Sequence, residues 1–113
     1  MKDFLLIYRA DYGVVANASP EEMQVRTQGW MDWIAGIAAQ NKLTDRGNRL
    51  MPQATVLKNE DIVTDGPFAE IKESIMGYSI IKATSMEEAA ALSKGCPIFK
   101  VGGTVEVREI NAL

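Results

Sequence analysis

Histidine is absent from the 113 residues of this sequence, and cysteine occurs only once. The first absence removes the commonest general base near neutral pH, the commonest metal ligand and the usual proximal ligand of haem. The single cysteine, Cys96, has no partner for an internal disulfide bond, which excludes a disulfide-stabilised scaffold and favours a reducing compartment. We therefore expect neither a bound metal nor a cofactor.

Long hydrophobic runs are missing as well. The longest, residues 4–8, is far shorter than the roughly 20 residues that a membrane-spanning helix needs. It ends at Arg9 and no small-residue cleavage site follows, so we expect no secretory signal. The net charge of −3 and the lack of clustered Lys and Arg argue against binding to a phosphate backbone. These absences predict a cytoplasmic protein that binds neither membranes nor nucleic acids.

The residues that are present are those of an ordinary globular protein, with 47% hydrophobic and 24% charged residues. Since no Ser/Gly-rich or Pro-rich run divides the chain, we predict a single domain over residues 1–113. Two capping boxes, at residues 19–22 and 85–88, each predict the start of a helix. The first helix is expected over about residues 20–41, where apolar residues recur at spacings of three, four and seven.

Apolar segments predict strands at residues 3–9, 53–58, 61–64, 77–83 and 104–110, whereas residues 43–52 have the composition of a polar connection. The predicted order is β-α-β-β-β-α-β, with the second and third strands paired as a hairpin. Right-handed crossovers place both helices on one face of the sheet, which leaves the opposite apolar face uncovered. A second copy of the chain is the expected cover, so we predict a homodimer that packs through this sheet face.

The motif at residues 63–73, which contains Asp65-Gly66-Pro67-Phe68, closely resembles that of the DGPF subgroup of the YCII-related family. Residues 4–8, 19–23, 77–78 and 102–108 also match family positions in the same order. The resemblance implies a ferredoxin-like α+β fold, with two helices on one face of an antiparallel sheet, which dimerises through the sheets into an α/β barrel. It also implies a short strand within residues 41–52, although the charged residues here make that segment more polar than usual.

The same resemblance implies a candidate site but no substrate. A His–Asp pair has been proposed as catalytic in the wider family. This sequence has no histidine, so only the aspartate of that pair has a counterpart here, Asp65. Family genes often lie beside genes for alternative sigma factors, which implies an association with a regulatory protein.

Asp65 is the leading candidate for a catalytic base, and Lys72 is a second catalytic candidate that would stabilise developing negative charge. Glu70 and Glu73 lie within the same eleven residues, and crowded carboxylates raise one another's pKa. Three other interpretations stay open. Asp65 can serve only to form the turn, the charged residues can be solvated ion pairs, and the carboxylates can bind Mg²⁺ weakly.

Two kinds of residue are candidates for binding a small molecule in a cleft between the first helix and the sheet. They are the aromatic Trp30, Trp33 and Tyr78 and the charged Arg9, Glu70 and Glu73. Core packing of the indoles and surface pairing of Arg9 with Asp11 or Glu106 are the alternatives. Cys96 lacks a nearby base and is expected to be a buried structural thiol.

The leading hypothesis is therefore a protein that binds a small molecule in this cleft, with Asp65 as the main polar group of the cleft. If the protein is an enzyme, we expect cofactor-free acid–base chemistry at Asp65. The competing hypothesis is a non-catalytic module that senses a ligand or docks a regulatory protein such as a sigma factor. In a third interpretation, the motif at Asp65 is only a corner needed for folding.

Overall fold

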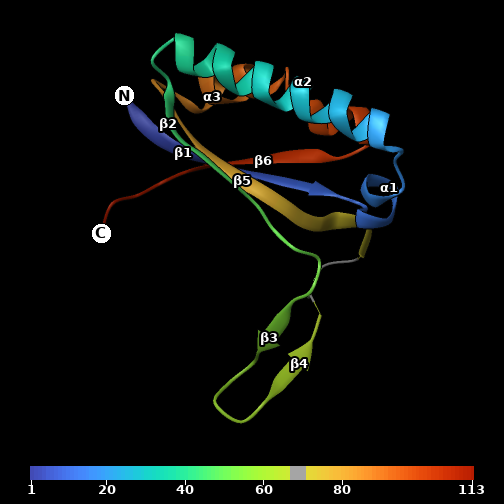
Figure 1. Cartoon of the computed structure of the whole chain (residues 1–113). Helices are drawn as coiled ribbons and strands as arrows, with labels where there is room; N and C mark the ends of the chain where they lie inside the picture. The colour runs from blue at the N-terminus through green and yellow to red at the C-terminus, as the bar shows by residue number, and fades with distance from the viewer. Residues whose placement is uncertain (67–70) are drawn as a thin grey trace.

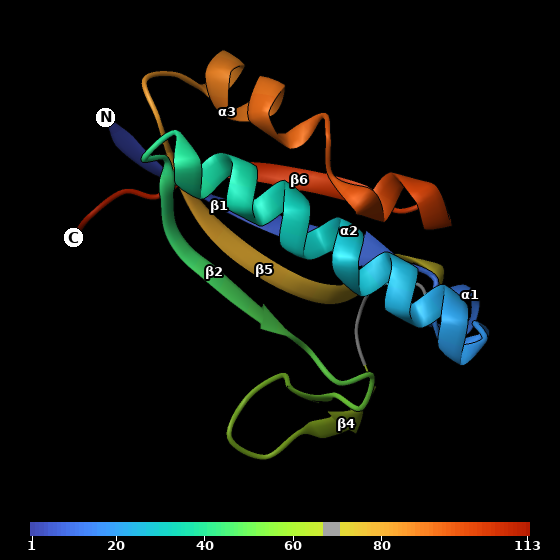
Figure 2. The ribbon, with the colours of Figure 1, turned by 45° about the horizontal axis from the view of Figure 1, so that its top comes forward.

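The computed structural model describes residues 1–66 and 71–113, without the side chain of Ile71. Its main body is a four-stranded antiparallel sheet in the order β2-β5-β1-β6. These strands are β1 (Lys2–Ala10), β2 (Leu43–Arg49), β5 (Ser74–Ala83) and β6 (Thr104–Glu109). Figures 1 and 2 show α2 (Pro20–Ala39) and α3 (Met86–Ser93) on the same face of this sheet. The α+β arrangement with both long helices on one face agrees with the sequence prediction. In the described chain, no helix is long and apolar enough to cross a bilayer.

Both helices begin where the capping boxes predicted. The amide of Glu22 donates to Ser19 Oγ over 3.1 Å, and the amide of Glu88 donates to Ser85 Oγ over 3.1 Å. Each hydroxyl satisfies a backbone donor that would otherwise have no partner in the first turn. The two helix starts are therefore fixed by local hydrogen bonds.

The core lies between the sheet and the two helices. Alternate residues of β1 point into it, and Phe4, Leu6 and Tyr8 are 0%, 0% and 4% exposed. The remaining buried residues come from β5, both helices and the segment before β6, and they include Ile81, Ile37, Ala89 and Ile98. Because side chains on a strand alternate between faces, Leu5 and Ile7 lie on the opposite side of the sheet.

The segment predicted as a polar connection is instead β2, an edge strand of the main sheet, as the family resemblance implied. Its pairing with β5 shifts register around Asp45 and again before Asn48. Gly47 lies in this bulge with a φ of +74°, and a Cβ there would clash with the carbonyl of Tyr78. The prediction failed because an edge strand with a bulge exposes most of its side chains and shows no apolar alternation.

The predicted hairpin is present as β3 (Thr55–Leu57) paired with β4 (Val63–Asp65). It is a separate two-stranded sheet that projects away from the main body (Figure 1). Its turn is closed by Asn59, whose side chain accepts hydrogen bonds from the amides of Asp61 and Ile62. The prediction of two paired strands was correct, but their place outside the main sheet was not foreseen.

Short helical segments occupy several connections. They are α1 (Tyr12–Ala16) and the 3₁₀ turns η1 (Ile71–Glu73) and η2 (Pro97–Val101). The carboxylate of Asp11 caps α1 by accepting from the amide of Gly13 over 3.0 Å. Among these segments, η2 places residues next to α2 and so contributes to the site described below.

The sheet face opposite the helices carries a stripe of apolar side chains. Leu5 pairs with Ile80, and Ile7 pairs with Tyr78, and all four residues are half-buried in the single chain. Ile75, which pairs with Arg9 on the same face, is 41% exposed. None of the described helices covers this stripe.

Candidate functional site

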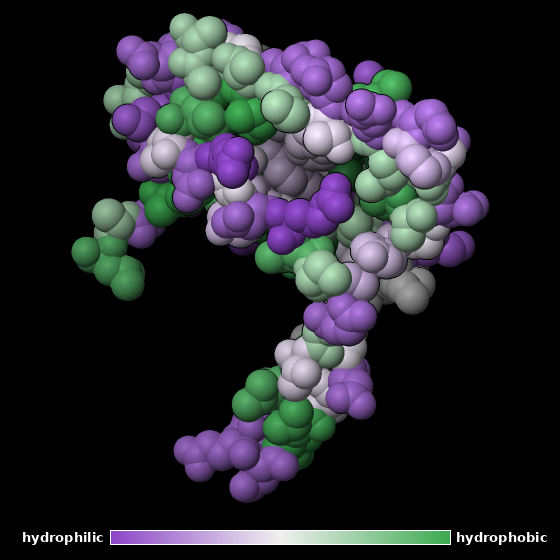
Figure 3. Space-filling model, viewed as in Figure 1, coloured by the Kyte–Doolittle hydropathy of each residue, from purple (hydrophilic) through white to green (hydrophobic). Residues whose placement is uncertain are grey.

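A cavity of about 490 Å³ lies between α2 and the main sheet. Its floor is formed by β1 and β5, its roof by α2, and one end by η2. The mouth opens beside the edge strand β2, where Figure 3 shows a hollow bordered by strongly hydrophilic side chains. We call this cavity the cleft. Its position between the first long helix and the sheet is the one that the sequence suggested for a binding site.

Aromatic rings form one wall of the cleft. The rings of Tyr8 and Trp30 meet edge to face, with centroids 4.8 Å apart and planes at 72°. Trp33 packs behind them, 5.7 Å from Trp30 and 6.1 Å from Tyr8. Edge-to-face contacts of this kind orient each ring and hold it in place. Tyr8 and Trp30 both line the cleft, so the cleft has a rigid apolar surface.

A chain of hydrogen bonds connects the floor of the cleft to its mouth. The hydroxyl of Tyr8 donates to Ser79 Oγ over 2.8 Å, and Ser79 Oγ donates to the backbone carbonyl of Arg46 over 2.7 Å. Burial raises the pKa of Tyr8 well above its ordinary value. Tyr8 is therefore a neutral phenol at every physiological pH, and its contribution to the cleft is an uncharged polar group.

The charged residues that line the cleft are all basic. They are Arg26 on α2, Arg46 and Arg49 on β2, and Lys100 on η2. Among the residues that the structure describes, neither Asp nor Glu lines the cleft. Because all of these charges are positive, the cleft has a positive potential, which attracts anions.

The four basic side chains differ in how far they are already engaged. Arg26 Nη1 donates to the carbonyl of Val15 over 3.1 Å, and Arg26 Nη2 lies 3.9 Å from a carboxylate oxygen of Glu22. Arg46, Arg49 and Lys100 are exposed, and none of the three forms an ion pair within the described chain. The guanidinium groups of Arg46 and Arg49 at the mouth are therefore available to a ligand, as is the ammonium group of Lys100.

The bulge in β2 places these two arginines. Asp45 accepts a hydrogen bond from the amide of Gly47 over 2.8 Å, which stabilises the left-handed conformation of that glycine. The extra residue changes the alternation of side chains, so that Arg46 and Arg49, three positions apart, both line the cleft. Asn48 between them donates to the hydroxyl of Tyr78 over 3.1 Å.

The structure brings together only some of the predicted ligand-binding residues. Trp30 lines the cleft, and Tyr78 borders it from a strand position whose side chain alternates to the opposite face of the sheet. Trp33 does not line the cleft, because its Nε1 donates to the carbonyl of Leu92 over 3.2 Å and its ring packs near Gly95. Trp33 is thus a packing residue between α2 and α3, which was the alternative given for one of the two indoles.

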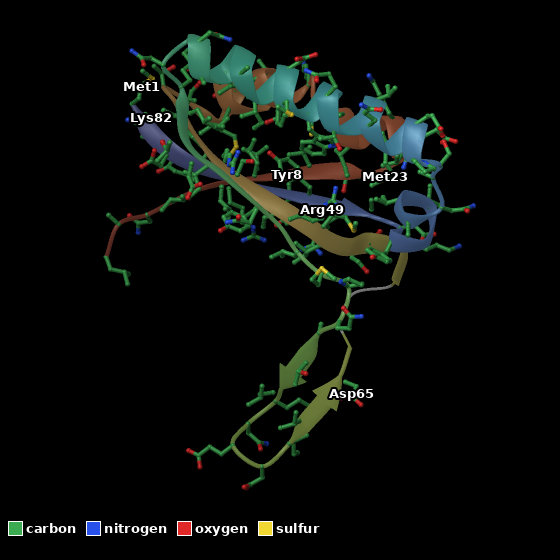
Figure 4. The ribbon with its side chains drawn as sticks, viewed as in Figure 1. Met1, Tyr8, Met23, Arg49, Asp65 and Lys82 are labelled. Atoms are coloured by element: carbon green, nitrogen blue, oxygen red, sulfur yellow. The ribbon has the colours of Figure 1, made fainter. Side chains whose placement is uncertain are left out.

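Asp65 lies on β4 in the projecting hairpin, apart from Tyr8, Met23 and Arg49 (Figure 4). It is exposed and borders a shallow depression formed with residues 52–55 and Gly66. It does not line the cleft, which corrects the expectation that it is the cleft's main polar group. The physical reason is that the hairpin carries the motif away from the sheet.

The other predicted site residues are also outside the cleft. Arg9 lies on the opposite sheet face, where its Nε is 3.4 Å from Glu106 and its Nη1 donates to the carbonyl of Glu73. Glu106 also pairs with Arg108, and hydrogen bonding to that guanidinium lowers the pKa of the Glu106 carboxyl group. Lys72 and Glu73 are exposed on η1, and the prediction for Glu70 lies outside the described residues.

Two further findings concern groups that could react or bind metal. Cys96 is 3% exposed, and burial raises the pKa of its thiol to about 12. It is therefore a buried structural thiol, as expected, rather than a nucleophile. The described residues contain no cluster of acidic or sulfur ligands that could hold a metal ion.

Sequence reasoning missed Tyr8, Ser79, Arg46 and Arg49. Tyr8 was counted only as an apolar position of a strand, although a buried tyrosine needs a hydrogen-bond partner near its hydroxyl. Arg46 and Arg49 lie in the segment that was interpreted as a connection. The signal that could have identified them is two arginines close to a glycine in a segment where the family has a strand.

Three comparisons relate the chain to known proteins. A model of the YCII-related domain matches residues 4–113. The protein described as "Uncharacterized protein R00369" of Rhizobium meliloti (strain 1021) is 40% identical over 62 residues, which cover 46% of this chain and 50% of that protein. The chain thus matches about half the length of that curated relative.

A solved structure is also similar. It is the 5-chloro-2-hydroxyhydroquinone dehydrochlorinase TftG from Burkholderia phenoliruptrix AC1100, in complex with 2,5-dihydroxybenzoquinone. The two chains are 19% identical, with 97% of this chain and 95% of that chain covered and a TM-score of 0.49.

Proposed function

The chain belongs to the YCII-related family, and we propose that it binds a small organic molecule in the cleft between α2 and the sheet. The observation that carries the proposal is the cleft itself. Its volume of about 490 Å³ lies within the range of roughly 300–1,000 Å³ that is typical of small-molecule sites. Its walls are mostly apolar and aromatic, with a few polar groups at defined positions, as in such sites.

We also propose that two copies of the chain associate through their uncovered sheet faces and close an α/β barrel. The apolar stripe around Leu5, Ile7 and Ile80 supports this, because an exposed apolar surface of this kind favours association. The ion pair of Arg9 with Glu106 lies at the margin of the same face and resembles the polar rim of an interface.

The finer family assignment and the location of the protein belong to the proposal. Membership of the DGPF subgroup is supported by Asp65 and Gly66, while Pro67 and Phe68 of the same motif lie outside the described residues. A cytoplasmic location is supported by the one free thiol, Cys96, which suits a reducing compartment.

Within this proposal, binding is favoured over catalysis. Asp65 and Lys72, the predicted catalytic residues, do not line the cleft, and no described residue there is a carboxylate or a histidine that could serve as a base. A catalytic role for Asp65 stays a prediction. The alternative of a protein-docking module has its own support in the hairpin, where Leu57 and Val63 are 65% and 57% exposed.

The experiment that tests the proposal is a thermal-shift screen of a metabolite library against three versions of the protein. Gly29 lines the cleft and has room for a side chain, so Gly29→Leu fills part of the cavity. Gly36, two turns along the same helix, has no described atom within 4 Å of its Cβ position, so Gly36→Leu is the matched control.

A specific ligand stabilises the native state in proportion to its affinity. We expect such compounds to raise the melting temperature of the wild type and of Gly36→Leu by similar amounts, and to have little effect on Gly29→Leu. The proposal is wrong if no compound stabilises the wild type, or if the same compounds stabilise Gly29→Leu equally well.

A further inference from the structure

We propose that the cleft selects a small organic anion, such as a carboxylate carried on a flat apolar body. This inference rests on the proposed function and adds the chemical class of the ligand. It is carried by the contrast between the apolar interior of the cleft and the basic residues at its mouth.

The distribution of charge is the first argument. The chain as a whole is acidic, with 15 Asp and Glu against 12 Lys and Arg. The cleft reverses that balance, since its described lining contains four basic residues and no acidic one. Positive charge beside an apolar wall of low dielectric attracts anions more strongly than the same charge on an open surface. The positive charge of the cleft is therefore a local property of its lining residues and does not follow from the overall composition of the chain.

The free state of two arginines is the second argument. Elsewhere in the described chain most basic side chains on the sheet have an acidic partner, as Arg9 and Arg108 have in Glu106. Arg46 and Arg49 have none, although they lie close together along β2. Two unpaired guanidinium groups that line the same cleft favour binding of an anion there, and a guanidinium group matches the two oxygens of a carboxylate.

The rigidity of the mouth is the third argument. Ser79 holds the carbonyl of Arg46 through a bond of 2.7 Å, and Gly47 fixes the bulge between the two arginines. Figure 4 shows Arg49 on the main body of the protein with Tyr8 and Met23, away from the projecting hairpin. The backbone that carries both guanidinium groups is thus fixed before a ligand arrives, which reduces the entropy lost on binding.

The interior of the cleft defines the rest of the ligand. Beyond the mouth, the lining is dominated by apolar and aromatic side chains, among them Val15, Met23, Trp30, Ile34 and Met76. A phosphate or another small inorganic anion would leave this surface unused. An apolar body bearing one anionic group uses both parts of the cleft, which is why the proposal names an organic anion.

The test uses three probes of nearly equal shape that differ in charge: 2-naphthoate, 2-naphthamide and 2-naphthylmethylammonium. Isothermal titration with the full chain at low ionic strength gives the Kd of each. A hydrogen bond to a charged group strengthens binding by about tenfold or more. We therefore expect the naphthoate to bind at least about tenfold more tightly than the amide, and the cation to bind most weakly.

Substitutions test whether the preference for naphthoate depends on Arg46 and Arg49 at the mouth of the cleft. In the double variant Arg46→Gln/Arg49→Gln, the advantage of naphthoate over naphthamide should be largely lost, with only the attraction of Arg26 and Lys100 remaining, while the amide binds as before. The double variant Lys58→Gln/Lys94→Gln removes the same number of positive charges from exposed positions outside the cleft and should leave all three affinities unchanged. Both mouth arginines are exposed, so their replacement is compatible with folding.

Each outcome decides between the two proposals. Equal affinities for naphthoate and naphthamide would overturn the selection of anions and leave the binding cleft intact. A preference for naphthoate that persists undiminished in the variant without Arg46 and Arg49 would overturn the assignment to these two residues. Failure of all three probes to bind would overturn the proposed function together with this inference.

Discussion

The hydroxyl of Tyr8 donates a buried hydrogen bond of 2.8 Å to Ser79, and this bond joins the two central strands beneath α2. Ser79→Ala leaves a buried donor without its acceptor, so we expect the free energy of unfolding to fall by about 1–3 kcal/mol. Urea denaturation measures the loss. The double variant Tyr8→Phe/Ser79→Ala removes both partners and should lose less than the sum of the single variants. Additive losses would show that the bond contributes nothing.

Gly47 is required by its backbone conformation and by the space around it. Gly47→Ala should destabilise the protein by more than about 2 kcal/mol, because a left-handed φ is strained for alanine and the new Cβ clashes with the carbonyl of Tyr78. Gly66 has a similar φ of +84° but no described atom within 4 Å, so Gly66→Ala should cost only about 1–2 kcal/mol. Chemical denaturation of the pair separates the clash from the strain, and equal losses would contradict this account.

The proposed dimer predicts a marked effect of charge at the centre of the uncovered sheet face. Ile7→Lys introduces a buried charge into that interface, so we expect the variant to sediment as a monomer at micromolar concentration while the wild type sediments as a dimer. Met86→Lys changes an apolar residue that is 43% exposed on α3 and should leave the dimer intact. A wild-type protein that sediments as a monomer would exclude the proposed association.

Cys96 makes the stability of the protein depend on alkaline pH. Burial raises the pKa of its thiol from 9.0 to about 12, so between these values the unfolded state loses the proton first. The contribution of the thiol to stability is complete below pH 9 and is lost as the pH rises toward 12, at up to about 1.4 kcal/mol per pH unit. Tyr8 acts with the same sign at higher pH, because burial also raises the pKa of its phenol.

Urea denaturation at pH 8, 9, 10 and 10.5 checks this dependence. In Cys96→Ala the decline in unfolding free energy between pH 9 and 10.5 should be shallower than in the wild type, whatever the effect of the substitution at pH 8. Parallel declines in the two proteins would mean that the thiol does not titrate differently in the folded and unfolded states.

Much of the fold could be predicted from the sequence because its signals are local. The capping boxes at Ser19 and Ser85 mark the starts of both long helices, and each is confirmed by a hydrogen bond within four residues. Strand β1 was found from a continuous apolar run. Strand β2 was not, because its pairing depends on β5, more than 25 residues away along the chain, and its bulge removes the alternation that marks a strand.

The site was predicted less well than the fold, for a physical reason. Asp65 was chosen because it belongs to the motif that resembles the DGPF subgroup and is followed by several ionisable residues, but the hairpin separates it from the cavity. Arg46 and Arg49 were visible as charges, yet their convergence on the cleft results from the register shift in β2. Trp30 lines the cleft and Tyr78 borders it, and a ligand-binding role for them stays a prediction.

The bulge at Gly47 has two consequences: it makes the edge strand irregular, and it places Arg46 and Arg49 at the cleft. An irregular edge strand is a poor template for pairing with another chain, so the kink protects the monomer's free border against uncontrolled β-sheet growth. A substitution that removed the bulge would therefore move Arg46 and Arg49 apart at the mouth of the cleft. It would also leave a regular edge strand that is prone to aggregation. Protection of this edge and the proposed recognition of anions therefore depend on the same irregular strand.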